Sequence, residues 1–476
     1  MKKTKFIISN FNKHLIVIIS LLFIYLFYLS IPSLYDKGKL QKDLTSKILE
    51  EFKINLSVSS EISYRILPSP HIVITNAKLF NDDLENPKEI SQIKKLNIFI
   101  SQKYFLDQNN LVIRKILIEE ANFSFQEVDF KFLKKLFEKK ISNKKILIKK
   151  SNFFFKDKNN KTISIFPIFK INLFYDEKKL VNNIGVIGEV FKIPFSIKWI
   201  KNFKNKINTV TVLKLQKLRL KIKNVSSNEN GIYLGNNTLI VGNNKLLSNY
   251  KIENDIITVL SQDTNLINNN INYKGEINTS PFYLKLDINL NKIDISKFLD
   301  TNSIFFELLK SNILFSRNLN AVISITSEDI IKNKLFNSSK ILINFNNGKI
   351  NFNNSYLKSK KIGLLKLYFS SLEFINKELV FKGRFNFNIN KQDEFYRIFQ
   401  ISKKIRKPVK NIFFDIEFNL FSNEIKINGI YLNNLKKETD NPLVDILAEY
   451  NNDNNKINNW IDLKNFMKKV FKNYSG

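Results

Sequence analysis

The spacing of apolar residues changes along this chain, and each spacing predicts a different kind of element. Near the N-terminus, Leu15–Ile31 is almost continuously apolar and is interrupted only by Ser and Tyr. A helix of this length can cross the ~30 Å hydrocarbon core of a bilayer. Lys39–Phe52 then repeats an apolar residue at every fourth position, which is typical of one face of an amphipathic helix.

The period falls to two in much of the remaining chain. Apolar residues alternate with polar ones in several segments, which predicts strands with one dry face and one wet face. The dry-face positions of the clearest segments are Leu284, Leu286, Ile288, Ile341, Ile343, Phe345, Phe385, Phe387, Phe414, Ile416 and Phe418. Asn347 and Gly348 separate two such segments, and both tolerate the positive φ of a tight hairpin. We therefore expect a mainly β fold, built as a long curled antiparallel sheet with a few short helices.

Helical patterns interrupt the strands at four places, which are Val128–Lys140, Asp294–Lys310, Asp393–Arg406 and Trp460–Tyr474. The last of these is amphipathic, and it either caps the β body or binds a membrane or a partner. The segment before it, Leu435–Asn459, is polar and rich in Asn, which predicts a linker. The expected organisation is a tail and membrane anchor over residues 1–35, a β body over 36–432, and a linker with a terminal helix over 433–476.

The charges around the apolar N-terminal segment predict its orientation. Lys2, Lys3, Lys5 and Lys13 precede it, and positively charged flanks stay in the cytoplasm. A cleavable signal peptide would have a shorter apolar core followed by a small-x-small site, which Ile31–Tyr35 does not offer. We expect an uncleaved anchor with the N-terminus inside. Its membrane-facing residues include Leu15, Ile16, Leu22, Phe23, Phe27 and Leu29.

Composition excludes several classes of protein. Of the 476 residues, 43% are hydrophobic, which is far too many for an intrinsically disordered chain. The absence of Cys excludes thiol nucleophiles, disulfides and cysteine-ligated zinc. The net charge of +33 comes from lysines spread along the whole chain among Asn, Ile and Phe. Such a composition is what an AT-rich genome imposes, and the alternative is a preference for anionic lipid head groups or lipopolysaccharide.

The sequence does not predict an enzyme. Its two histidines are far apart, with His14 beside the anchor and His71 in a turn bracketed by prolines. No glycine-rich phosphate-binding motif is present, and adjacent carboxylates such as Glu119 and Glu120 point to opposite faces of a strand. We predict no catalytic residues, no metal site and no cofactor.

Two internal echoes suggest repetition. Lys115–Phe125 resembles Lys145–Phe155, but a chain with so few residue types produces such a match by chance, so we give it little weight. The scarce residues Gly and Pro carry the second echo. Gly188-Glu189-Val190, Pro194-Phe195 and Lys198 recur with identical spacing as Gly275-Glu276-Ile277, Pro281-Phe282 and Lys285. This second echo favours a stack of similar hairpins.

The dry face of the predicted sheet needs a cover. Leaving one large apolar side chain in water costs about 1.5–3 kcal/mol relative to burial, and a few short helices shield only part of a long sheet. One solution is a closed β-sandwich with a core made only of protein. The other is a trough that takes an apolar guest, for which an acyl chain is the natural candidate. The dry-face positions named above are then the candidate groove residues, with ordinary core packing as their alternative role.

The N-terminal region resembles a known family. The anchor leads through Ile31–Leu40 into the amphipathic helix and then into Lys53–Phe80, whose most specific feature is the turn Leu67–Ile72. This order is similar to the start of the AsmA family of Gram-negative envelope proteins. Further likeness lies in Asn291–Leu299, around Gly348, and from Lys361-Ile362-Gly363 through Gly383. The likeness covers most of residues 1–432.

The resemblance implies a single-pass inner-membrane (plasma-membrane) anchor and a periplasmic body. It also implies a β-groove similar to bridge-like lipid transfer proteins and a role in outer-membrane lipid homeostasis or assembly. The expected partners are phospholipid or another anionic envelope lipid, the inner membrane, and outer-membrane or periplasmic proteins, with no nucleic acid. The alternative is a non-catalytic scaffold or regulator of outer-membrane protein assembly that moves no lipid.

Overall fold

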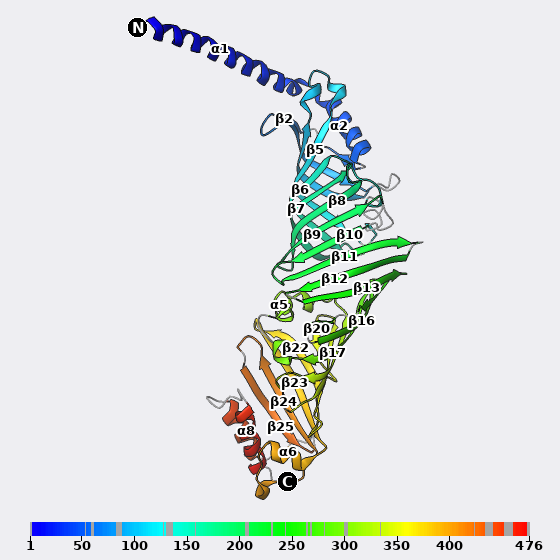
Figure 1. Ribbon diagram of the computed structural model, residues 1–476, viewed down its shortest axis with the longest axis vertical. Coiled ribbons are helices and arrows are strands. Elements are labelled where there is room, and N and C mark those ends of the chain that lie inside the picture. Colours follow the sequence, from blue (N-terminus) through cyan, green and yellow to red (C-terminus); the bar gives the residue numbers. More distant parts are fainter. Residues whose placement is uncertain are drawn as a thin grey trace. The chain divides into compact units, whose positions relative to one another are not determined.

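The computed structural model of the chain is mainly β, as the alternating pattern predicts (Figure 1). It describes residues 2–52, 54–58, 61–81, 88–126, 128–129, 137–157, 159–204, 209–229, 232–242, 244–262, 265–266, 269–279, 281–298, 303–333, 335–422, 424–433, 441–451 and 460–473. The chain divides into two compact units, Met1–Ser227 and Asn228–Gly476. This division falls inside the stretch that the sequence predicts as one body.

The first unit opens with three helical elements, α1 (Lys2–Ser30), the 3-10 turn η1 (Ile31–Leu34) and α2 (Lys37–Phe52). The stretch Lys13–Leu34 is long and apolar enough to cross a membrane. Of the predicted anchor residues, Leu15, Ile16, Leu22, Phe23 and Phe27 are 44–70% exposed, as a lipid-facing helix requires. Leu29 is instead only 5% exposed, because it packs into the core of the first unit together with α2.

Tyrosine hydroxyls join the end of α1 to the sheet. Tyr64 Oη donates a 2.6 Å hydrogen bond to the Leu29 carbonyl, and Tyr28 Oη donates to the carbonyl of Gln102. The ring of Phe105, which is 1% exposed, lies 5.7 Å from that of Tyr28 and 6.4 Å from that of Tyr64. The C-terminal end of α1 is therefore tied to the body by polar and aromatic contacts.

This junction predicts a loss of stability at high pH. Burial, together with the nearby Tyr35, raises the pKa of Tyr64 to about 12. The folded state holds the Tyr64 proton more tightly than the unfolded state does. The resulting contribution to the free energy of unfolding is therefore complete below about pH 10 and is lost as the pH rises towards 12. In urea titrations of the full chain in detergent, we expect the free energy of unfolding to fall more steeply over this range for the unaltered protein than for Tyr64→Phe. Identical pH profiles for the two proteins would contradict the prediction.

The strands of the first unit follow one another in the sheet. They are β1 (Asn55–Ser57), β2 (Ile62–Arg65), β3 (His71–Phe80), β4 (Glu89–Ile100), β5 (Ile113–Phe125), β6 (Lys145–Lys156), β7 (Thr162–Asp176), β8 (Val181–Val190), β9 (Ile193–Asn202), β10 (Thr209–Leu215) and β11 (Leu220–Glu229), whose last two residues belong to the second unit. Both β1 and β2 pair with β3, and each later strand pairs with the next one in the chain. The short turns η2 (Gln102–Tyr104) and η3 (Gln108–Asn110) lie between β4 and β5.

The second unit is built in the same way. Its strands are β12 (Ile232–Val241), β13 (Asn244–Glu253), β14 (Ile256–Ser261), β15 (Asn265–Leu266), β16 (Asn269–Thr279), β17 (Phe282–Ile293), β18 (Ala321–Ile330), β19 (Ser338–Asn346), β20 (Lys349–Asn351), β21 (Tyr356–Lys358), β22 (Gly363–Ile375), β23 (Glu378–Ile389), β24 (Asn411–Asn419) and β25 (Glu424–Leu432). Its helical elements are α4 (Ile295–Phe298), α5 (Ile304–Lys310), η4 (Ile313–Phe315), α6 (Gln392–Ile398), η5 (Lys403–Ile405), α7 (Asn441–Asn451) and α8 (Trp460–Asn473).

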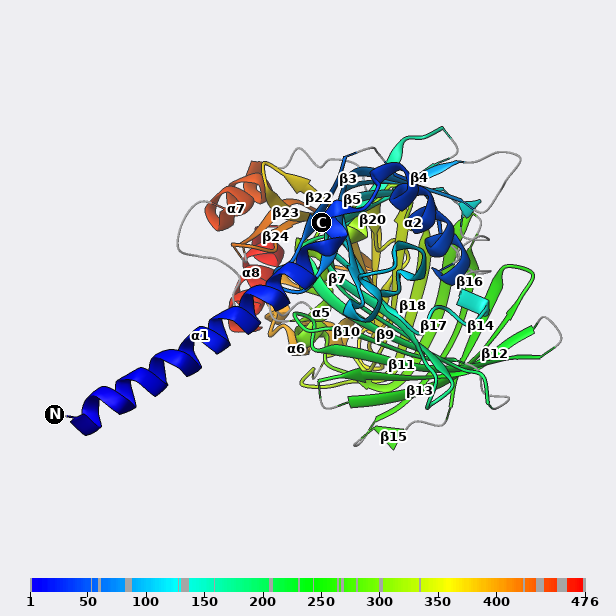
Figure 2. The same cartoon turned by 90° about the horizontal axis from the view of Figure 1, so that it is seen from above.

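The sheet of the second unit curls. Within this unit, β16–β18 and β22–β24 stand on different sides of the view in Figure 2. Successive strand pairs connect these two groups. After β14, which pairs with β16, the order runs from β16 to β17, then to β18 and to β19. Strand β19 pairs with both β20 and β21, and each of these pairs with β22. The predicted hairpin at Asn347 and Gly348 is confirmed, with φ of 55° and 77° between β19 and β20. The curl gives the unit an inner face and an outer face.

Among the described strands, the prediction of antiparallel pairing holds except at two places. The pairs β5–β6 and β17–β18 are parallel. In β5–β6 the register runs from Lys115 opposite Lys145 to Phe125 opposite Phe155, so the first echo is two neighbouring strands aligned position by position. Our dismissal of this echo as chance missed a real structural relationship.

The second echo lies in two antiparallel hairpins, β8–β9 and β16–β17, as expected. Their registers nevertheless differ. Gly188 lies opposite Phe195, whereas Gly275 lies opposite Leu286 rather than Phe282. The shared spacing therefore marks similar elements without an equivalent pairing.

Three of the four predicted helical segments contain helices, and one further helix was not predicted. The segment Asp294–Lys310 contains α4 and α5, Asp393–Arg406 contains most of α6 and all of η5, and Trp460–Tyr474 contains α8. Most of Val128–Lys140 lies outside the described residues. The predicted linker Leu435–Asn459 is wrong over α7, whose Leu443 and Ile446 are 4% and 6% exposed. The polar residues around this short apolar face obscured its helical period.

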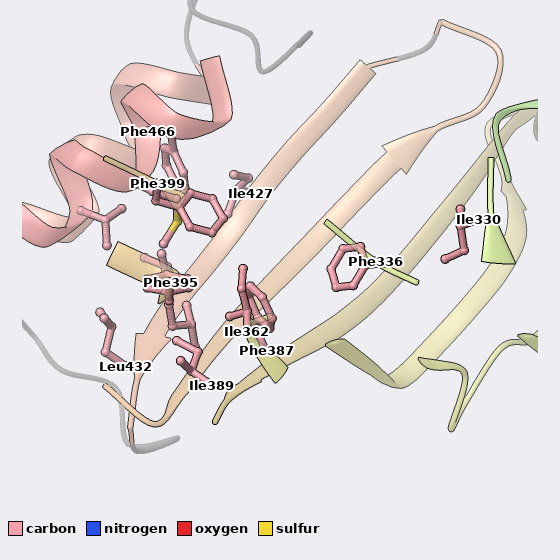
Figure 3. Close-up of a cluster of buried hydrophobic side chains, with 14 of the residues drawn as sticks. Ile330, Phe336, Ile362, Phe387, Ile389, Phe395, Phe399, Ile427, Leu432 and Phe466 are labelled. Carbon is pink, nitrogen blue, oxygen red and sulfur yellow. The ribbon is translucent and has the colours of Figure 1, made fainter. Parts of the chain in front are cut away.

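The C-terminal helices close part of the core of the second unit. Phe466, Met467, Val470 and Phe471 of α8 are buried. Figure 3 shows Phe466 beside Phe399, with Phe395 below them near the strands. On α7, the side-chain amide of Asn451 donates to the carbonyl of Ile427 and accepts from its N–H, which occupies backbone groups of β25. The terminal helix therefore caps the β body, which is one of the two roles predicted for it.

Candidate functional site

The inner face of the second unit carries the candidate groove residues. Register places Phe385 opposite Phe414 and Gly383 opposite Ile416, and the same face continues through Ile343 opposite Ile323. Three of the candidates, Ile343, Phe345 and Phe387, are buried core residues with 2–5% exposure. Leu284, Leu286, Ile288 and Phe414 are half-buried. The remaining four, Ile341, Phe385, Ile416 and Phe418, line one cavity.

This cavity has a volume of about 430 Å³ and is partly open to solvent. Its lining is almost wholly apolar and comes from Ile295, Phe305, Lys340, Ile341, Phe352, Ser355, Tyr356, Leu357, Leu365, Leu367, Leu372, Phe381, Phe385, Ile416, Phe418, Leu420 and Ile425. Pockets of several hundred Å³ are the usual size of small-molecule sites. We call it the second-unit cavity.

Helices pack near this cavity, and Ile295 of α4 and Phe305 of α5 form part of its wall. In α5, Phe306 is 2% exposed and its ring lies 5.9 Å from that of Phe421. In α6, Phe395 is fully buried and contacts Phe471 of α8, with ring centroids 5.8 Å apart. Strand residues such as Phe385, Ile416 and Phe418 form the rest of the cavity wall.

Irregular strands shape the cavity wall. The β22–β23 register shifts between Tyr368 and Ser371, and the β24–β25 register shifts between Asp415 and Ile416. Such bulges bend a strand and sharpen its twist. Between them, Gly383 leaves space for its neighbours, because a Cβ there would come within 2.9 Å of Leu367 Cδ1. The bulges and the glycine together allow this part of the sheet to curl.

An ion pair on the outer face holds the same strands. Arg384 donates from Nε and Nη2 to the two carboxylate oxygens of Asp415 at 2.6 and 2.8 Å. Its hydrogen bond to Asp415 raises the pKa of Arg384 despite partial burial. Because strand side chains alternate, fixing Asp415 outwards turns its neighbour Ile416 into the cavity.

The first unit holds a second apolar cavity of about 360 Å³, which we call the first-unit cavity. Its walls include Phe52 at the end of α2, Phe123 and Phe125 of β5, Phe153 of β6, and Trp199 of β9. The ring of Phe153 lies 4.7 Å from Phe123 and 5.6 Å from Phe125. Sequence reasoning missed this cavity, although the first echo carries these phenylalanines and was the available signal.

No family model matches this chain, and no curated protein matches it significantly in sequence. What it binds must be inferred from the shape and chemistry of the two cavities.

His71 has a structural role. It begins β3 directly after the turn that contains the cis peptide Leu67–Pro68, and it is 6% exposed. Its Nδ1 lies 2.7 Å from the carbonyl oxygen of Ser69, and its ring stacks on Phe99 at 4.9 Å. Among the described residues, no group of three or more His, Asp or Glu side chains could hold a metal ion. The absence of an enzymatic activity stays a prediction.

Proposed function

We propose that this chain is a membrane-anchored envelope protein that shelters phospholipid acyl chains in its apolar cavities and passes them between membranes. The observation that carries the proposal is the second-unit cavity, an apolar space of about 430 Å³ that opens to solvent and that the chain's own helices leave unfilled. Acyl chains fit such a wall because they require no hydrogen-bonding partner. The transfer needs no covalent step.

The presence of a cavity in each unit supports a carrier with more than one acyl-binding position. In both cavities a helix contributes to the wall, through Phe52 of α2 in the first unit and Phe305 of α5 in the second. Charged head groups would remain at the wet margin, where Lys340 borders the second-unit cavity. Lipids held in this way avoid exposing their chains to water.

The anchor and the sequence resemblance complete the proposal. The exposed apolar surface of α1 supports insertion into the inner membrane. The lysines before it favour a cytoplasmic N-terminus and a periplasmic body. Membership of the AsmA family and a role in outer-membrane lipid homeostasis are part of this proposal and stem from the N-terminal motifs.

Site-specific cross-linking tests the cargo. A photo-reactive phenylalanine analogue is placed at Phe385 in the second-unit cavity or at Trp199 in the first-unit cavity of the full chain in cells. We expect mass spectrometry of the labelled peptides to find phospholipid adducts at both positions. Phe413 provides the matched control because it lies on the neighbouring strand β24 and faces the other side of the sheet. Phe23 of α1, which is 68% exposed, reports ordinary bilayer lipid.

The alternative scaffold function predicts a different pattern. A scaffold would give protein adducts at Phe413 or other outer positions and no lipid adduct at Phe385 or Trp199. Lipid adducts of equal yield at Phe385 and Phe413 would also overturn the proposal, because they would indicate nonspecific contact with lipid.

A further inference from the structure

The outer face of the first unit contains a depression distinct from both apolar cavities. Strands β7–β11 enclose a volume of about 620 Å³ there. Gly185 forms its floor, since a Cβ built at this position has no neighbouring atom within 4 Å. Ile184 and Val186, on either side of this glycine, line the first-unit cavity on the inner face. The depression therefore opens on the opposite side of the sheet.

The depression is strongly basic. Four exposed lysines, Lys170, Lys198, Lys214 and Lys221, stand around it, and none of the residues lining it is acidic. None of these four lysines forms an ion pair within the part of the chain that the structure describes. Glu119 lies on the same row of the sheet but two strands away from Lys170, where it pairs with Lys95 at 3.6 Å.

Register places like charges directly against each other. Lys214 of β10 lies opposite Lys221 of β11, and Lys149 of β6 lies opposite Lys170. Directly opposed residues in a sheet have Cβ atoms about 4.5–5.5 Å apart, where like charges repel and destabilise the pair. An anion in the depression would convert this repulsion into attraction.

A polar group in the depression also lacks a partner. Asn172 lines it from β7, and its Oδ1 is buried with no hydrogen-bond partner among the described residues. A half-turn of the side-chain amide exchanges its oxygen with its N–H group, so Asn172 can donate to an anion. Buried polar groups without partners are uncommon, and a bound ion is one of the explanations for such a group.

The outer face of the second unit shows the contrasting arrangement. There Arg384 pairs with Asp415 at 2.6 Å, and Lys382 lies 3.7 Å from Glu417. The protein itself neutralises the charges of these two cross-strand pairs. The basic depression differs from this part of the second unit because its lysines have no acidic residue opposite them.

We infer that the basic depression binds a phosphate-bearing ligand with at least two negative charges. The lysines supply charge-assisted hydrogen bonds to phosphate oxygens, Asn172 adds a neutral donor, and the space above Gly185 admits the group. Either a phosphorylated lipid head group or a soluble phosphate compound presents this chemistry. The inference concerns the outer face and does not depend on what the apolar cavities hold.

Pyrophosphate binding to the full chain in zwitterionic detergent tests the site by calorimetry. Replacing Lys198, Lys214 and Lys221 with Gln removes three positive charges and should lower the affinity by about tenfold or more. The matched control replaces three exposed lysines of the second unit, Lys349, Lys358 and Lys361, with Gln. It removes the same charge and should leave the affinity unchanged.

Gly185→Leu separates a built site from general charge attraction. The new side chain fills the floor of the depression without meeting a neighbouring atom close to its Cβ, and all four lysines remain. We expect pyrophosphate affinity to fall while thermal stability without ligand is kept. The proposal would be overturned if both triple lysine variants lost the same affinity for pyrophosphate and Gly185→Leu bound it as tightly as the unaltered protein.

Vesicles distinguish the sources of the phosphate. The chain is reconstituted in phosphatidylcholine with or without phosphatidic acid, and pyrophosphate is then titrated. If phosphatidic acid weakens pyrophosphate binding, and Gly185→Leu abolishes this weakening, the ligand is a lipid head group. If phosphatidic acid leaves pyrophosphate binding unchanged, the ligand is a soluble phosphate compound. Tighter binding of a short DNA duplex than of pyrophosphate, with the same sensitivity to Gly185→Leu, would overturn the inference in favour of nucleic acid.

Discussion

Ile416→Asp should empty the second-unit cavity of lipid while leaving the unit folded. Ile416 is half-buried and lines the cavity beside Phe385 and Phe418. The cavity opens to solvent, so water can hydrate the new carboxylate until an acyl chain enters. Displacing that water costs several kcal/mol, which lowers occupancy by at least about tenfold. The measurement is the yield of lipid adducts from the photo-reactive group at Phe385.

Two aspartate variants serve as comparisons for Ile416→Asp. Phe413→Asp introduces the same charge on the same strand but on the outer face, and it should leave the adduct yield unchanged. Ile343→Asp places the carboxylate at a position that is 2% exposed, where an unpaired charge should cost about 4 kcal/mol or more and prevent folding. The two inner positions therefore separate cavity wall from packed core.

Leu357→Trp tests the same cavity without a charge. Leu357 is half-buried and lines the cavity from β21, so a larger ring there occupies space that an acyl chain would use. Adduct yield at Phe385 should again fall. If both Ile416→Asp and Leu357→Trp kept normal adduct yields with the fold intact, the cavity would not be the lipid site.

Phe471→Ala should destabilise the second unit by about 3–5 kcal/mol, the usual cost of removing a fully buried phenylalanine side chain. Phe471 of α8 has no exposed surface, and its ring lies 5.8 Å from both Phe395 and Tyr396. Its removal leaves a cavity where α8 meets α6. The free energy of unfolding is measured by urea titration of the full chain in detergent.

Tryptophan fluorescence isolates this effect. The chain has two Trp, and Trp199 lies in the first unit, so Trp199→Phe leaves Trp460 as the reporter for the second unit. The Trp460 ring lies 5.3 Å from Phe399 and follows the docking of α8. Ile461→Ala is the matched control on the same helix, since Ile461 is 67% exposed and its loss should change stability by less than about 1 kcal/mol. Similar losses for both variants would show that α8 does not belong to the core.

Local patterns predicted the strands well because their causes are local. Alternation placed Phe385, Phe414 and Ile416 on one face, and the structure keeps them there. Asn347 and Gly348 formed the expected hairpin because their tolerance of positive φ does not depend on distant contacts. The helix α7 was missed because its apolar face is short and becomes evident only against β25.

The spacing of the inner-face residues did not show which of them line a cavity. Ile343 and Ile416 have the same chemistry and the same alternation, yet one is core and the other is cavity wall. The difference depends on where α5, α6 and α8 dock and on the bulge between Asp415 and Ile416. Leu29 likewise continues the apolar pattern of α1, but its environment is set by packing against the body.

The order of apolar and polar side chains was enough to predict the apolar N-terminal helix, the mainly β character of the body and the two faces of its strands. The two parallel pairs among the described strands, the division into two units, the positions of the apolar cavities and the grouping of lysines around Gly185 became evident only in the folded chain. These depend on register between strands distant in sequence, where a shift of one residue moves every side chain to the other face.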